Sequence, residues 1–102
     1  MEAYDLSQVA AADFTHHIGK TVVIHFAKDF SLPSTILKVL ELNTYSPLER
    51  GAFSVEFQTT GENRAIAQGI YRVEYPDGKY MDVFLVPIAH DPGGMRYEAV
   101  FS

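Results

Sequence analysis

The last third of the chain, residues 70–101, predicts three antiparallel strands joined by two tight turns. Pro76, Asp77 and Gly78 separate two runs that are rich in aromatic and β-branched residues. In such a turn proline presets the first dihedral, aspartate hydrogen-bonds the backbone ahead of it, and glycine takes the positive φ that ends the turn. The sequence His-Asp-Pro-Gly-Gly at residues 90–94 provides the second reversal. This span therefore indicates an antiparallel meander.

The first turn also predicts the register of its hairpin. If residues 76–78 form a three-residue type I turn with a glycine bulge, Arg72 faces Asp82 across the ladder, and the opposite charges favour this pairing. The same register places alternate apolar side chains on one face, which we expect to be the core. The expected core residues are Tyr71, Val73, Tyr75, Met81, Val83, Leu85, Tyr97, Ala99 and Phe101.

The opposite face of these strands is apolar too, although an antiparallel sheet usually leaves one polar face in water. We therefore expect this second face to be covered by an N-terminal helix, by closure of a barrel or by another subunit. Any protein interaction is expected there. Pro87 cannot donate to a ladder, so a bulge or an edge is expected at its position. The residues of the expected interaction face are Ile70, Arg72, Tyr80, Asp82, Phe84, Val86 and Val100.

The first part of the chain predicts one short helix and then a strand. Apolar residues at helical spacing predict an amphipathic helix over about Ser7 to His17, and Gly19 supplies a left-handed stop. Residues 21–26 follow as a strand with alternate apolar side chains. Residues 29–34 contain a proline and are expected to form a loop.

The middle of the chain is ambiguous at residues 34–45, where the apolar spacing suits a helix but the β-branched content and flanking prolines favour a strand. Residues 52–59 alternate as a half-buried strand does, and residues 60–63 form a turn or loop. The sequence thus predicts a mainly β fold, an antiparallel meander of about six strands partly closed into a barrel or sandwich, with one short N-terminal helix. The alternative is an α+β fold with residues 34–43 as a second helix.

The size and charge of the chain limit the functions it can have. Its 102 residues predict a single domain, residues 1–102, because a chain of this length buries one core. The absence of cysteine excludes disulfides, thiolate zinc sites and cysteine nucleophiles. A formal net charge of -5 argues against a nucleic-acid partner. No signal peptide or bilayer-spanning apolar stretch is found, so we expect no membrane association and a cytoplasmic protein.

The last third combines four short segments in a specific order. These are Gln-Gly-Ile-Tyr at residues 68–71, Pro-Asp-Gly at 76–78, Phe-Leu-Val-Pro-Ile at 84–88 and Tyr-Glu-Ala-Val-Phe at 97–101. Together they resemble an uncharacterised family of short bacterial domains, and Phe14 and Gly19 extend the likeness toward the N-terminus. The resemblance implies no activity. It implies a structural or accessory role, such as a part of a phage-tail-like assembly.

No motif in the chain indicates a catalytic, cofactor or metal site. Asp82 and Glu98 share one face of the predicted sheet, but Arg72 keeps the Asp82 carboxylate ionised, which favours ion pairing over acid–base catalysis. Glu98 lies in an otherwise apolar strand and needs a partner if it is buried. The histidines lack the spacing of metal ligands: they are His16, His17, His25 and His90.

The sequence therefore favours a non-enzymatic structural or protein-interaction domain. It would bind a protein partner or self-associate, for example as a homodimer, through the second face of the meander. The alternative is a small-ligand-binding or catalytic β-barrel with a tyrosine-lined pocket. The residues of that pocket would be Gln68, Tyr71, Tyr75, Phe84, Tyr97 and Glu98. No cofactor is expected.

Overall fold

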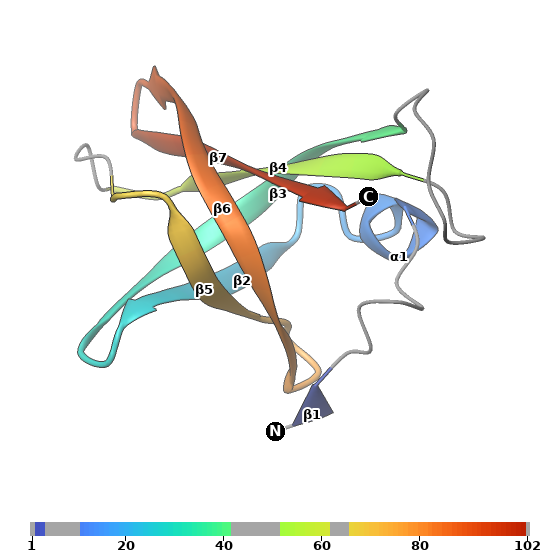
Figure 1. The fold of residues 1–102 in the computed structure, drawn as a ribbon, viewed down its shortest axis with the longest axis horizontal. Coiled ribbons are helices and arrows are strands. Elements are labelled where there is room, and N and C mark those ends of the chain that lie inside the picture. The colour runs from blue at the N-terminus through green and yellow to red at the C-terminus, as the bar shows by residue number, and fades with distance from the viewer. Residues whose placement is uncertain (1, 4–10, 42–51, 62–65, 102) are drawn as a thin grey trace.

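The computed structural model describes residues 2–3, 11–41, 52–61 and 66–101 (Figure 1). The elements are β1 (Glu2–Ala3), α1 (Ala11–Thr15), β2 (Thr21–Ala27), β3 (Phe30–Glu41), β4 (Phe53–Thr59), β5 (Gly69–Glu74), β6 (Lys79–Asp91) and β7 (Gly94–Phe101). Within the described residues, six strands close into an antiparallel barrel in the order β5-β2-β3-β4-β7-β6, because β6 pairs with both β5 and β7. The short strand β1 pairs in parallel with the start of β6.

The predicted fold class is confirmed: the chain is mainly antiparallel β, with a six-stranded closed barrel and a short N-terminal helix. The predicted strands at residues 21–26 and 52–59 are β2 and β4. The α+β alternative is wrong for the described part of the chain, because residues 34–41 lie in β3 and pair with β4. Residues 42 and 43 lie outside the described ranges.

The predicted helix is present as α1, although its expected beginning at Ser7 lies outside the described residues. Gly19 has a φ of 86°, which confirms the left-handed stop after the helix. Phe14 is the buried residue of α1. Among the described residues, no helix is long and apolar enough to cross a membrane.

The turn between β5 and β6 has the predicted chemistry. Gly78 has a φ of 87°, and its N–H donates to the carbonyl oxygen of Tyr75 at 3.0 Å. The Asp77 carboxylate accepts a hydrogen bond from the Lys79 N–H at 2.9 Å. As a result Arg72 lies opposite Asp82, and the predicted register of this hairpin is confirmed.

The hairpin of β6 and β7 also follows the sequence. The pairing shifts between Pro87 and Ala89, which is the bulge expected where proline cannot donate to the ladder. Only two residues separate β6 from β7, and Gly93 has a φ of 97°, as the second central position of a type II turn requires. A Cβ on the next residue, Gly94, would lie 1.8 Å from the Thr59 carbonyl oxygen, so β4 and β7 approach here as only glycine allows.

The predicted loop at residues 29–34 is wrong, because β3 begins at Phe30 and contains Pro33. The Pro33 carbonyl accepts a hydrogen bond from the Thr60 N–H at 3.0 Å. The backbone N and O atoms of one strand residue point to the same neighbouring strand, so the Pro33 nitrogen also points toward the β4 side. It lies opposite a position that follows Thr59, the last residue of β4. No ladder donor is needed there, and proline is tolerated inside the strand.

The core lies between the inward faces of the strands and α1. Of the expected core residues, all except Tyr71 are buried, and Tyr71 packs against the core from a partly exposed position. The ring of Phe14 lies 5.3 Å from that of Phe101 and 5.8 Å from that of Phe53, measured between centroids. It lies 6.1 Å from the ring of Tyr75. α1 therefore covers the end of the barrel where β4 begins and β7 ends (Figure 1).

Candidate functional site

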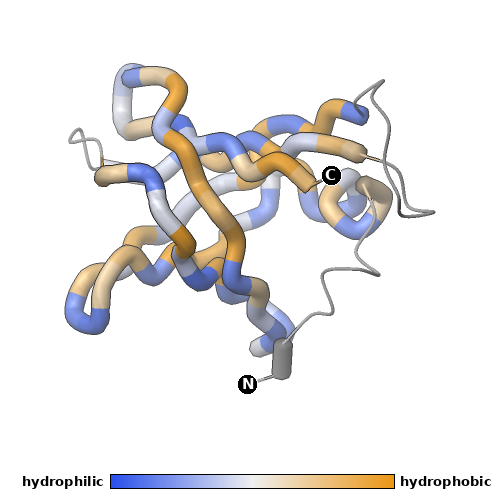
Figure 2. Tube along the Cα trace, viewed as in Figure 1, coloured by the Kyte–Doolittle hydropathy of each residue, from blue (hydrophilic) through white to orange (hydrophobic). Residues whose placement is uncertain are grey.

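The seven residues of the predicted interaction face share the outer surface of β5, β6 and β7. Ile70 lies directly opposite Phe84, and Arg72 lies directly opposite Asp82, on β5 and β6. Val86 lies opposite Glu98 of β7, so Val100, two residues further on, points to the same side. Figure 2 shows β6 as apolar along most of its length. Tyr80 of β6 is the seventh residue of this set. We call the seven residues the interaction face.

Among the described residues, no element covers the interaction face. The side chains of Ile70, Phe84 and Val100 are 71%, 50% and 57% exposed. The expectation that α1 covers the face is wrong, because α1 packs against β3 and β4. The expectation that barrel closure covers it is also wrong, because closure places this face on the outside. The third expected cover, another subunit, stays a prediction.

One end of the interaction face carries a paired arginine. The Arg72 guanidinium donates to both carboxylate oxygens of Asp82, at 2.9 and 3.2 Å, and lies 3.9 Å from the centre of the Tyr80 ring. The hydrogen bonds from Arg72 lower the pKa of Asp82, and Asp82 in turn raises the pKa of Arg72. Asp82 therefore stays ionised, which is the opposite of what a general acid requires.

The other end of the interaction face borders on Glu98. This half-buried side chain lies between Val86 on β6 and Glu56 on β4, its direct neighbours across the two ladders. Within the described residues, no hydrogen bond or ion pair compensates its charge. Glu56 is bound by Arg96, so Glu98 is left as a half-buried carboxylate without an ion pair of its own among the described residues.

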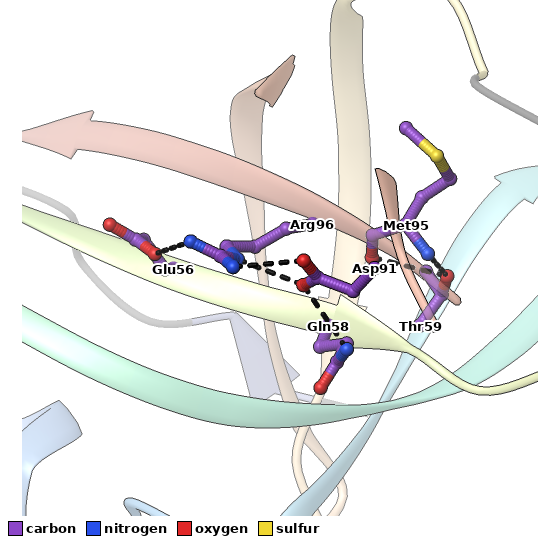
Figure 3. Close-up of polar contacts among 6 residues, drawn as sticks. All are labelled: Glu56, Gln58, Thr59, Asp91, Met95 and Arg96. Carbon is purple, nitrogen blue, oxygen red and sulfur yellow. Dashed lines mark hydrogen bonds and ion pairs between the residues drawn. The ribbon is translucent and has the colours of Figure 1, made fainter. Parts of the chain in front are cut away.

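A second polar group, which sequence reasoning missed, lies on the outer surface where β4, β6 and β7 meet (Figure 3). The Arg96 guanidinium donates to both oxygens of Asp91, at 3.0 and 2.9 Å, and to Glu56 at 3.4 Å. The Gln58 amide donates to Asp91 at 3.2 Å. We call these four residues the arginine cluster. The local signal was the arginine five residues after the turn aspartate.

The arginine cluster is internally complete. The hydrogen bonds that Arg96 donates to the Asp91 carboxylate raise the pKa of Arg96. Beside the cluster, the Thr59 hydroxyl accepts a hydrogen bond from the Met95 N–H at 3.0 Å and lies 3.3 Å from the Met95 carbonyl oxygen (Figure 3). These contacts fix the register of β4 against β7, so the cluster has a structural role.

The structure does not bring together the six residues of the predicted ligand pocket. Tyr71, Tyr75 and Tyr97 point into the barrel, whereas Phe84 and Glu98 point outward and Gln68 is exposed before β5. The Tyr97 hydroxyl accepts a hydrogen bond from the Ile66 N–H at 2.8 Å, and the Tyr71 hydroxyl donates to the Ala67 carbonyl. The two hydroxyls thus bind the chain segment that precedes β5.

The hollows found on the described surface are shallow. One, of about 320 Å³, is lined by His25, Ala27, Lys28 and Arg72. His25 Nε2 lies 2.9 Å from the Glu74 carboxylate, so the hydrogen bond to Glu74 gives this histidine a structural partner. Among the described residues, no group of three metal-binding side chains forms.

A family model for a domain of unknown function (DUF6916) matches residues 9–101. The chain belongs to this family. The resemblance to an uncharacterised family of short domains is thereby confirmed, and the match covers α1 and strands β2 to β7. Comparison with curated proteins gives no match, and comparison with solved structures gives none either.

Proposed function

We propose that this DUF6916 domain is a non-enzymatic protein-interaction module that binds a partner protein through its interaction face. The observation that supports this most is the exposure of Ile70, Phe84 and Val100 on neighbouring strands of a sheet that is otherwise complete. Burying such side chains against a partner contributes roughly 25 cal/mol per Å² of apolar surface. An accessory role in a phage-tail-like assembly, built by protein contacts, is one setting for such a module.

The charges of the outer surface support binding over catalysis. Arg72 is paired with Asp82, and Arg96 with Asp91 and Glu56, so each arginine already binds a carboxylate of its own chain. A paired carboxylate with a lowered pKa, such as Asp82, does not supply a proton near neutral pH. The outer face therefore offers apolar contact area rather than reactive groups. A cytoplasmic location stays a prediction, which cell fractionation tests.

The experiment is photo-crosslinking in the source cells with a benzophenone amino acid at position 84 and, as control, at position 18. Ile18 is also an exposed large apolar residue, but it follows α1, away from the interaction face. We expect a discrete crosslinked protein at position 84 that is absent at position 18. The same products at both positions, or none at 84, would contradict the proposal.

A folding control completes this test. Phe84→Asp should leave the free domain folded, with an unchanged circular dichroism spectrum, because the Phe84 side chain contributes little to the core. If Phe84→Asp unfolds the isolated domain, the interaction face is part of its fold rather than a binding surface.

A further inference from the structure

We infer that the partner of the interaction face is a second copy of this chain, packed about a two-fold axis that passes close to Phe84. The inference rests on the proposed function, because it names the partner of the same face. Two-fold symmetric association is the commonest form of oligomer, and it requires one patch that is complementary to itself. The register of β5, β6 and β7 provides such a patch in both its apolar and its charged residues.

The apolar part of the patch is centred on β6. Ile70 lies on β5, directly opposite Phe84, and Val100 lies on β7, on the other side of β6. A residue on a two-fold axis meets its own copy, so Phe84 of each chain packs on Phe84 of the partner subunit. Paired aromatic rings add favourable contact beyond their buried area. Ile70 and Val100 then flank this central contact on the two sides.

The charged part of the patch lies along one diagonal. From Phe84, Arg72 is one strand away toward β5 and two residues toward the start of β6, because it pairs with Asp82. Glu98 is one strand away toward β7 and two residues toward the end of β6, because it pairs with Val86. Phe84 therefore lies near the midpoint between Arg72 and Glu98.

Consider a two-fold axis that lies in the plane of the face and runs perpendicular to the line from Arg72 to Glu98. Rotation about this axis exchanges the two ends of that line. Arg72 of each chain then faces Glu98 of the partner subunit, and the contact occurs twice. Arg72 uses two of its five N–H donors on Asp82, so donors remain for a second carboxylate. The half-buried Glu98, which has no ion pair of its own among the described residues, gains one in this arrangement.

The absence of cysteine in the natural chain makes the geometry directly testable. In Phe84→Cys the thiol lies on the proposed axis, and mild oxidation should link two chains through one disulfide. Ile18→Cys is the matched control at an exposed apolar position outside the face. We expect the disulfide-linked dimer to form at least about tenfold faster for position 84 than for position 18. Equal rates at the two positions would overturn the inference.

Sedimentation of the unmodified chain provides the second readout. Its mass should rise from one chain to two as concentration increases from micromolar to millimolar. Glu98→Arg should weaken dimerisation at least about tenfold, because it sets two cations against each other, and the double variant Arg72→Glu with Glu98→Arg should recover it. A mass of one chain at every concentration, or no recovery in the double variant while both variants stay folded, overturns the inference.

The two proposals can fail separately. If the purified chain stays monomeric while position 84 crosslinks to a different protein in cells, self-association is wrong and the interaction module stands. If position 84 crosslinks to another copy of the chain and the unmodified chain dimerises, both stand. If neither crosslinking nor dimerisation is found, both are wrong.

Discussion

The arginine cluster and the interaction face lie on the same outer surface and share β6 and β7. They differ in how far their side chains are paired and buried within the chain. In the cluster, the Glu56 and Asp91 side chains are only 15% and 17% exposed, and Arg96 binds both of them. On the interaction face, Ile70 and Phe84 pair with each other and remain open. The arginine cluster thus satisfies its own polar groups, whereas the interaction face presents apolar side chains that a partner would bury.

The largest effect on stability is expected for a substitution of Gly94, where β7 lies against β4 beside the arginine cluster. In Gly94→Ala the added Cβ would overlap the Thr59 carbonyl, so the backbones of β4 and β7 must separate. We expect a loss of more than about 4 kcal/mol in the free energy of unfolding, measured by urea denaturation.

Gly93→Ala is the control for this substitution, because Gly93 has a positive φ but no neighbour near its Cβ position. Its cost should be only about 1–2 kcal/mol, from backbone strain. Equal losses for the two alanine variants would show that the close approach of β4 to β7 does not limit the fold.

Adjacent residues of β6 test the two faces of one strand. Leu85 is fully buried and its neighbour Phe84 is half exposed. Leu85→Ala should lower the free energy of unfolding by about 2–5 kcal/mol, whereas Phe84→Ala should change it by less than about 0.5 kcal/mol in dilute, monomeric protein. A comparable loss at Phe84 would mean that the interaction face belongs to the core.

The two arginines should differ in their effect on thermal stability. Arg96→Met removes the cation that binds two mostly buried carboxylates, so the midpoint of thermal unfolding should fall by several degrees. Arg72→Met should lower it less, because Asp82 is 45% exposed and water can replace the arginine. A larger fall for Arg72→Met in the monomer would reverse the comparison between the two surfaces.

The smallest expected effect is on the stability of the domain at acidic pH. Arg72 lowers the pKa of Asp82, so the stability contributed by this pair is present above the ordinary pKa of an aspartate and is lost as the pH falls through the lowered value. Asp82→Asn removes this loss, and its stability curve should be slightly flatter below about pH 4. Urea denaturation across this pH range measures it, with Asp29→Asn as an exposed control in the turn before β3. Identical acid slopes for Asp82→Asn and the unmodified chain would contradict it.

The β5–β6–β7 meander could be predicted because its signals are local. Pro76 and Gly78 define one turn, Pro92 and Gly93 define the other, and strict alternation separates the two faces. The bulge at Pro87 follows from its missing N–H alone. These features depend on residues a few positions apart, so tertiary structure had little opportunity to override them.

Features that depend on distant strands could not be predicted. The sequence predicts a loop at Pro33, because the position of this residue beyond the end of β4 is visible only once β3 and β4 are paired. The same holds for Arg96 and Glu56, which meet only because β4 pairs with β7. The candidate ligand residues lie on different faces for a simpler reason, because strand alternation places Tyr97 and Glu98 on opposite sides of β7.

The position of the Phe14 ring also bears on how the domain is made in the cell. This ring, from the first helix, packs on Phe101 at the end of the last strand. Phe14 is translated well before Phe101, so the site of this ring is complete only after β7 has been made. Until then the hydrophobic interior has an opening, which leaves apolar surface of the nascent chain exposed.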